Sequence, residues 1–242
     1  MTDRRAELAD NLTRVRARLA SAAATAGRDP AGITLIAVTK TYPATDVRLL
    51  AELGVTDIGE NRDQEAAPKA AELRTDSAMP PLRWHFIGQL QRNKCRSVAG
   101  YADVVQSVDR VSLARALGTA AGRLRDRPLA VLIQVSLDGA TGRGGALPSS
   151  ADPEHGFWPV VEAVLAESGL RLDGVMAVAP SEQPAGPAFA RLAQVSAQLT
   201  AQVSGACAIS AGMSGDLAEA IANGATQVRI GSALLGNRPR LR

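Results

Sequence analysis

The sequence is poor in aromatic residues and in cysteine, and both shortages limit what it can build. Aromatic residues make up 3% of the 242 residues, so the core must consist mainly of Ala, Val, Leu and Ile. The two cysteines, Cys95 and Cys207, are too few to indicate a disulfide framework or a thiolate metal site. We therefore expect reduced thiols and no bound metal. The scarcity of aromatics also argues against a surface that stacks nucleic-acid bases.

Long apolar runs are missing as well. No apolar stretch is long enough to span a bilayer, and the first residues are charged and amphipathic rather than typical of a signal peptide. The net charge of +3 does not by itself indicate nucleic acid, because the basic residues are interspersed with acidic and apolar ones. We expect a cytoplasmic protein with neither a membrane nor a nucleic-acid partner.

An alternation of short apolar runs and helical stretches fills most of the chain. Leu8, Leu12, Val15 and Leu19 follow helical spacing and predict an amphipathic helix before the first strand, 34–38. Seven further strands are predicted at 57–59, 83–87, 103–107, 129–135, 172–177, 206–210 and 227–230. Helices are predicted at 45–53, 65–73, 111–124, 159–167, 189–203 and 215–223.

Buried strands that alternate with helices are typical of a parallel sheet covered on both faces, and eight such units close a (β/α)8 barrel. An open doubly wound sheet is the alternative. Against it, the first strand is followed by residues 39–43 (Thr-Lys-Thr-Tyr-Pro) instead of a glycine-rich dinucleotide turn. We predict an α/β fold: one TIM-barrel domain over residues 1–242 with an additional N-terminal helix. The glycine-rich stretch 138–156 is expected to be a mobile loop of that domain.

The loops that follow the strands should carry the chemistry, because barrel active sites lie at the C-terminal ends of the strands. Lys40 comes directly after the first strand. Desolvation there would favour its neutral amine, which can attack an aldehyde to form a Schiff base; the alternative is a lysine that reaches into solvent. The last two loops contain Ser210 and the pair Gly231 and Ser232, whose hydroxyls and amides suit a phosphate group.

Several motifs in a fixed order together resemble one protein family. They are residues 37–40 (Ala-Val-Thr-Lys), 58–62 (Ile-Gly-Glu-Asn-Arg), 84–94 (Trp-His-Phe-Ile-Gly-Gln-Leu-Gln-Arg-Asn-Lys), 106–109 (Gln-Ser-Val-Asp), 174–177 (Gly-Val-Met-Ala), 212–214 (Gly-Met-Ser) and 229–236 (Arg-Ile-Gly-Ser-Ala-Leu-Leu-Gly). This set resembles the pyridoxal phosphate homeostasis proteins, also called the YggS or proline synthetase co-transcribed family. The run 84–94 is the most specific part.

The resemblance implies a barrel related to the N-terminal domain of alanine racemase, with pyridoxal 5′-phosphate (PLP) attached covalently to Lys40. It implies that the phosphate lies near Ser210, Gly231 and Ser232. The remaining cofactor-binding positions that it implies are Arg229, facing the pyridine nitrogen, and Asn61 and His85, lining the mouth near the ring.

Catalysis is expected to be weak or absent, and no catalytic residue is assigned. A guanidinium beside the pyridine nitrogen disfavours its protonation and makes the ring a poorer electron sink, although the related racemase is expected to share this arrangement. Racemases of this type also have a second domain that supplies an acid or base, and nothing comparable follows the last strand here. His85 or Tyr42 could replace that group, but a structural role for His85 is at least as plausible.

The resulting hypothesis is a monomeric PLP carrier or buffer that serves PLP-dependent apoenzymes. Two alternatives stay open. One is a low-activity PLP-dependent amino-acid racemase or lyase. The other is a phosphate-binding barrel enzyme that uses Lys40 as a base without any cofactor.

Overall fold

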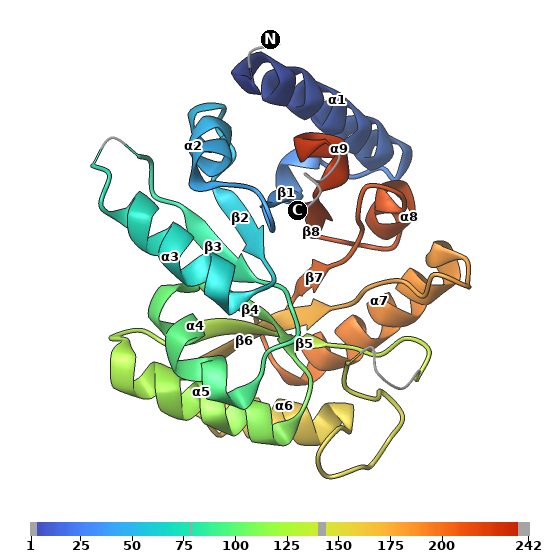
Figure 1. The fold of residues 1–242 in the computed structure, drawn as a ribbon. Helices are drawn as coiled ribbons and strands as arrows, with labels where there is room; N and C mark the ends of the chain where they lie inside the picture. Colours follow the sequence, from blue (N-terminus) through green and yellow to red (C-terminus); the bar gives the residue numbers. More distant parts are fainter. Residues whose placement is uncertain (1–3, 78, 140–143, 237–242) are drawn as a thin grey trace.

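Eight parallel strands form a closed barrel in the order in which they occur in the chain (Figure 1). The structure, a computed structural model, describes residues 4–77, 79–139 and 144–236. The strands are β1 (Thr34–Val38), β2 (Asp57–Glu60), β3 (Arg83–Phe86), β4 (Val104–Val108), β5 (Leu129–Gln134), β6 (Leu170–Met176), β7 (Ala208–Ser210) and β8 (Gln227–Ile230). The barrel closes where β1 pairs with β8, from Thr34 opposite Gln227 to Ala37 opposite Ile230. The predicted barrel is therefore confirmed.

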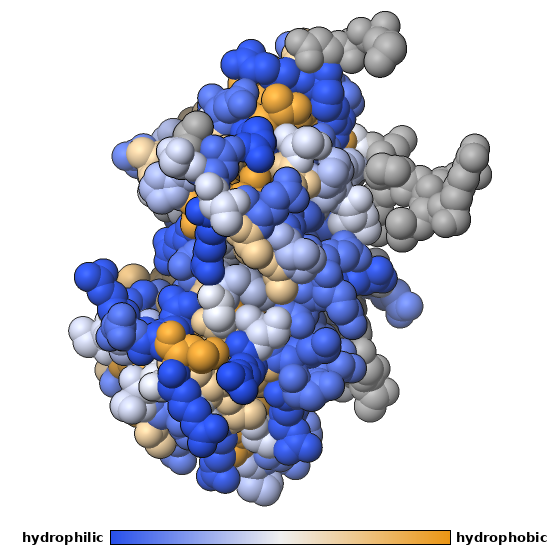
Figure 2. Space-filling view, turned by 60° about the vertical axis from the view of Figure 1, so that its left-hand side comes forward, coloured by the Kyte–Doolittle hydropathy of each residue, from blue (hydrophilic) through white to orange (hydrophobic). Residues whose placement is uncertain are grey.

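Helices surround the barrel on its outer side (Figure 1). They are α1 (Arg4–Thr25), α2 (Ala44–Glu52), α3 (Asp63–Arg74), α4 (Cys95–Tyr101), α5 (Val111–Leu124), α6 (Phe157–Leu165), α7 (Ala185–Gln202), α8 (Leu217–Ala222) and α9 (Ser232–Leu235), with short 3-10 turns at Pro30–Gly32 and Arg92–Lys94. Their apolar faces point inward, and the surface seen in Figure 2 is mainly hydrophilic with small, separate hydrophobic areas. No helix of the described residues is long and apolar enough to cross a membrane.

The core lies mainly between the strands and the helices. It is rich in Ala, Val, Leu and Ile, and the few large aromatics are placed in it: Trp84, Phe86, Phe157 and Phe189 are almost completely buried. A separate small apolar cluster, Val104, Ala130, Leu132 and Met176, occupies the opposite face of the sheet. Because side chains alternate across a strand, this cluster fills part of the barrel interior.

The predicted elements differ from the observed ones mainly at their ends. The sixth strand begins at Leu170, two residues earlier than predicted, and β7 is only three residues long. The helix α7 begins directly after Pro184, a residue that suits a helix start and gave no periodic signal. The short helix α9 lies in the segment after β8, which was predicted to be a loop. In the glycine-rich stretch, Ala146 and Leu147 form isolated bridges with Val135 and Gly156, and residues 140–143 lie outside the described residues.

The additional N-terminal helix packs against the last two helices, α8 and α9. Leu8, Leu12, Val15 and Leu19 are buried, as their spacing predicts. The helix α1 contacts α8 and α9, and Figure 1 shows it running beside both. The N-terminal helix therefore covers the two elements that come after β7 and β8.

Candidate functional site

A cavity of about 400 Å³ opens at the C-terminal ends of the strands. It is lined by Val38, Lys40, Tyr42, Asn61, Ile87, Gly88, Met176, Val178, Met213, Ser214, Gly215, Arg229, Gly231, Ser232 and Gly236. Five of the seven predicted site residues are in its wall: Lys40, Asn61, Arg229, Gly231 and Ser232. His85 and Ser210 are not. The described residues contain no cluster of His, Cys, Asp and Glu that could hold a metal ion.

Lys40 lies in a tight turn directly after β1. Thr39 is buried, and Thr41 has a φ of +71°, the only positive φ of a non-glycine residue in the described ranges. The backbone N–H of Thr41 donates to Glu65 Oε2 at 3.0 Å, and Lys69 Nζ donates to the carbonyl oxygen of Thr39 at 3.0 Å. Both partners come from α3, so this helix binds the chain on each side of Lys40.

A buried ion pair lies beneath the same turn. Lys69 Nζ is 2.5 Å from Glu60 Oε1, which also accepts a hydrogen bond of 2.7 Å from Thr39 Oγ1. Burial raises the pKa of Glu60 above the usual carboxyl range, while Lys69 and Thr39 act in the opposite direction. Sequence reasoning missed this pair. Glu60 lies in one of the quoted motifs, but nothing in the sequence states which face of α3 meets it.

Asn61 enters the cavity wall where the loops after β2 and β3 meet. A Cβ atom at Gly88 would lie only 2.1 Å from the carbonyl oxygen of Asn61. The close approach of the two loops therefore requires glycine at position 88. Buried oxygens of three residues in this region, Thr41 Oγ1, Glu60 Oε2 and Asn61 Oδ1, have no hydrogen-bond partner within the described structure. Asn61 therefore offers an acceptor to a molecule in the cavity.

The loops after β7 and β8 bring hydroxyls and backbone amides together. The Oγ atoms of Ser214 and Ser232 are 3.5 Å apart, and the Ala233 amide lies 3.4 Å from Ser214 Oγ. Gly215 and Gly231 also line this part of the cavity. Ser214 was not among the predicted site residues, although it belongs to the quoted motif at 212–214. Hydroxyls and amides at such a place can bind a phosphate group.

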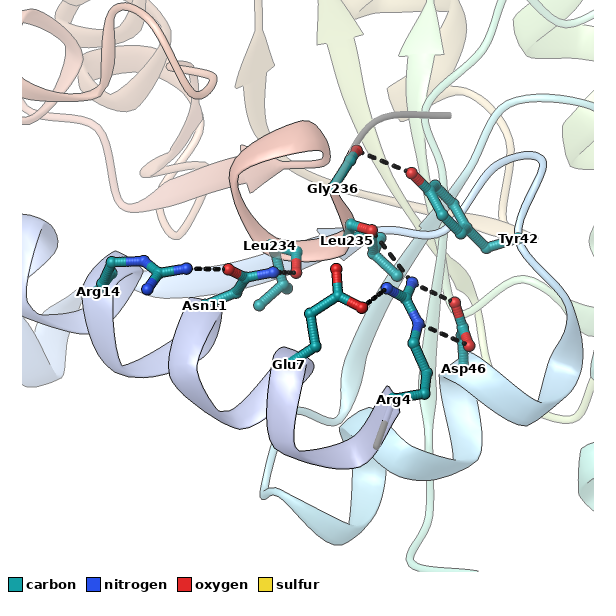
Figure 3. Close-up of polar contacts among 9 residues, drawn as sticks. All are labelled: Arg4, Glu7, Asn11, Arg14, Tyr42, Asp46, Leu234, Leu235 and Gly236. Atoms are coloured by element: carbon teal, nitrogen blue, oxygen red, sulfur yellow. Dashed lines mark hydrogen bonds and ion pairs between the residues drawn. The ribbon is translucent and has the colours of Figure 1, made fainter. Parts of the chain in front are cut away.

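Hydrogen bonds from α1 hold the carboxyl end of α9 (Figure 3), the short helix that begins at Ser232. Arg4 Nη2 donates to the carbonyl oxygen of Leu235 at 3.1 Å, and Asn11 Nδ2 donates to that of Leu234 at 2.9 Å. These bonds satisfy carbonyl groups that a helix end leaves without an internal partner. The N-terminal helix therefore fixes the short helix α9, which begins at Ser232.

Arg4 is itself held by residues of α2 and of the loop before it. It forms an ion pair of 2.6 Å with Asp46 on α2, which is the largest cause of its raised pKa, and its guanidinium lies 5.8 Å from the centre of the Tyr42 ring. The Tyr42 hydroxyl donates to the carbonyl oxygen of Gly236 at 2.9 Å. Tyr42, considered above as an acid or base, thus binds the chain just after α9 (Figure 3).

Arg229 is buried and still reaches the cavity. Its Nη1 donates to Ser210 Oγ at 2.7 Å and its Nη2 donates to the carbonyl oxygen of Ala177 at 2.8 Å. Burial lowers the pKa of Arg229 to about 10, with a smaller opposing effect of Asp216. The guanidinium therefore remains a cation at neutral pH.

Ser210 and His85 lie deeper in the barrel than predicted. The Ser210 hydroxyl accepts from Arg229 and donates to Gln106 Oε1 at 2.7 Å, and Ser210 does not line the cavity. Gln106 Nε2 lies 3.0 Å from His85 Nδ1, which must accept because the amide nitrogen is a donor. His85 Nε2 then donates to Asp57 at 2.9 Å.

Burial lowers the pKa of His85, while Asp57 acts in the opposite direction. The ring is therefore neutral and has a partner on each nitrogen. The prediction placed His85 at the mouth, near the ring of the cofactor. In the structure His85 is buried and does not line the cavity. This position supports instead the structural role that was weighed beside that prediction.

Comparisons with known proteins agree with the barrel fold and identify its family. Residues 8–239 match the family model of the alanine racemase N-terminal domain. A pyridoxal phosphate homeostasis protein of Mycobacterium tuberculosis is 41% identical over 254 residues, covering 99% of this chain and 96% of the relative. The structure of PipY from Synechococcus elongatus with PLP bound is 32% identical, with a TM-score of 0.79 over 95% of this chain and 100% of that one. Alanine racemase from Streptomyces coelicolor has the same fold at 22% identity, with a TM-score of 0.71, and the match covers 58% of its length.

Proposed function

This chain belongs to the alanine racemase N-terminal domain family and, within it, to the pyridoxal phosphate homeostasis proteins, and from that premise we propose that it binds PLP at Lys40 and carries or buffers it. One observation carries the proposal: Lys40 and the hydroxyls of Ser214 and Ser232 line the same cavity. A primary amine is what the aldehyde of PLP needs, and a set of hydrogen-bond donors is what its phosphate needs.

The other residues of the wall fit the rest of the cofactor. Val38, Ile87 and Met176 supply apolar surface for an aromatic ring, and Asn61 Oδ1 is a buried acceptor without a partner in the described structure. Ser214, Ser232 and the amide of Gly231 would hold the phosphate. Arg229 would face the pyridine nitrogen, and its charge would keep that nitrogen unprotonated.

When bound, PLP supplies an aldehyde that forms a Schiff base with an amine and can exchange it for another amine. The role of Lys40 is to present its amine to that aldehyde and to accept it again on reloading. The residues on either side of Lys40 are bound by α3, which holds the lysine at the cavity wall. We propose that the whole chain works as one monomeric, cytoplasmic domain that delivers PLP to apoenzymes.

The composition of the cavity wall favours a carrier over a racemase or lyase. Apart from Lys40 and Arg229, the one titratable side chain among the described lining residues is Tyr42, and its hydroxyl donates to Gly236. A racemase needs a second group that moves a proton on the other face of its substrate. Among the described lining residues, no acid or base beyond Lys40 is placed for this second proton transfer.

Transfer to a recipient enzyme tests the proposal. Protein loaded with PLP is mixed with a PLP-dependent apoenzyme, and recovery of the recipient's activity is followed against free PLP at the same total concentration. A carrier should give recovery within minutes and no D-alanine formation from L-alanine above that of free PLP. Failure to reactivate the apoenzyme would overturn the proposal, and D-alanine turnover that Lys40→Ala abolishes would favour the racemase instead.

A further inference from the structure

The turn that carries Lys40 has a backbone conformation that its own sequence disfavours. Thr41 is β-branched and has a φ of +71°. In this left-handed region the Cβ atom crowds the backbone, and such residues persist only where the surrounding structure holds them. Thr41 directly follows Lys40, so whatever holds Thr41 also fixes the direction of the lysine.

The helix α3 supplies the groups that hold this turn. Glu65 and Lys69 are four residues apart and so lie on the same face of the helix. Glu65 accepts the hydrogen bond of the Thr41 amide, and Lys69 donates to the carbonyl oxygen of Thr39. One rigid element thereby binds the residues immediately before and after Lys40.

The charge of Lys69 is balanced at the same place. Glu60 and Lys69 expose 1% and 8% of their side chains, and Thr39 Oγ1 donates to the same oxygen of Glu60. An unbalanced carboxylate next to the turn would favour the ammonium form of Lys40, whereas the neutral amine is the nucleophile. The pair itself therefore adds no net charge beside the reacting lysine, and the carboxylate of Glu65 is paired with Arg62 at 3.3 Å.

We propose that Glu65 and Lys69 are positioning residues for Lys40, and that Glu60 is the counter-ion that lets Lys69 serve in this way. The proposal rests on the proposed function of Lys40. The clamp formed by Glu65 and Lys69 determines how fast the Lys40 amine reacts, in the cofactor-free protein as well as with PLP. It acts through the backbone of residues 39–41 and touches neither the cofactor nor the reacting atoms.

The chain is well suited to a direct test, because Lys40, Lys69 and Lys94 are its only lysines. The cofactor-free protein is labelled briefly with acetic anhydride, and modification of Lys40 is measured by peptide mass spectrometry relative to Lys94. In parallel, the rate at which the visible absorption band appears after PLP is added is measured by stopped flow. Both rates are normalised to the folded fraction obtained from thermal unfolding.

Glu65→Ala is expected to slow both Lys40 reactions by about tenfold or more, as misplacement of a reacting group does. Glu65→Gln keeps a neutral acceptor and should give an intermediate effect. Adding Thr41→Gly to Glu65→Ala should restore most of the rate, because glycine adopts the positive φ without the clamp. The matched control is Glu72→Gln, an exposed glutamate on the same helix, which should behave as the wild type.

Lys69→Met alone leaves a buried carboxylate without its partner and should strongly destabilise the fold. The paired variant Glu60→Gln with Lys69→Met removes both charges and should fold, yet react about tenfold more slowly because the donor to Thr39 is gone. Wild-type rates per folded molecule in both Glu65→Ala and the paired variant would overturn the proposal. A wild-type protein that forms no visible band would instead contradict the proposed function, while the labelling would still decide the inference.

Discussion

The two ends of the cavity are held in different ways. At the lysine end, α3 binds the Lys40 turn through Glu65 and a Glu60–Lys69 pair that is almost completely buried. At the phosphate end, α1 binds the helix α9 through Asn11 and Arg4, and Arg4 leaves 32% of its side chain exposed. Breaking a buried pair leaves an uncompensated charge, whereas a part-exposed contact is screened by water. The lysine end therefore depends on a buried charge pair, whereas the phosphate end is held by one buried neutral hydrogen bond and a part-exposed arginine.

The buried pair gives the largest expected effect. Lys69→Met should lower the free energy of unfolding by about 3–5 kcal/mol, the usual cost of a buried charge that loses its partner. Glu60→Gln together with Lys69→Met should lose much less. Urea unfolding measures both. Equal losses in the single and the paired variant would show that the lysine end does not depend on the charge of Glu60.

The phosphate end should govern affinity rather than attachment. Ser232→Ala combined with Ser214→Ala should raise the Kd for PLP by about 100-fold or more, because two hydrogen bonds to a charged group are lost and each contributes at least about 1.5 kcal/mol. At saturating PLP the visible band should remain. Fluorescence titration measures the Kd, with the exposed Ser149→Ala as the control. A wild-type Kd in the double variant would place the phosphate elsewhere.

The barrel interior beneath both ends should respond to acid. Burial lowers the pKa of His85 below its ordinary 6.5, so the unfolded chain binds a proton that the folded protein does not. Its contribution to stability is complete above about pH 6.5 and is lost as the pH falls, by at most about 1.4 kcal/mol per pH unit. Unfolding measured from pH 7.5 to 5.5 should show this slope, and His85→Gln should reduce it. An unchanged slope in His85→Gln would assign the acid sensitivity to other groups.

The contacts of α1 give the smallest expected effect. Asn11→Ala removes one hydrogen bond to the carboxyl end of α9 and should lower stability by about 1 kcal/mol and PLP affinity a few-fold. Arg16→Gln serves as the control, since Arg16 lies on the same helix but contacts Gly54 instead. Thermal unfolding and titration measure the two effects. If Asn11→Ala were as damaging as Lys69→Met, the contrast between the two ends would not hold.

Much of this arrangement could be predicted from the sequence, because it depends on the residues that come directly after each strand. The period of the apolar runs indicated eight strands and the barrel, and the strand ends placed Lys40, Arg229 and Ser232 at one mouth. The depth of a side chain was not predictable in this way. His85 and Ser210 occupy strand positions whose partners, Gln106 and Arg229, come from distant parts of the chain. The α3 clamp was missed for the same reason, since spacing alone does not show which backbone groups Glu65 and Lys69 reach.

The most direct test of the central claim is the visible absorption spectrum of the PLP-loaded protein before and after borohydride, for the wild type and Lys40→Ala. Mass spectrometry of the reduced peptides then locates the attached group. The account predicts a yellow protein whose band borohydride removes, with the reduced cofactor on the peptide that contains Lys40, and no such band in Lys40→Ala. A colourless wild type that ignores added PLP, or a cofactor trapped on Lys69 or Lys94, would contradict it.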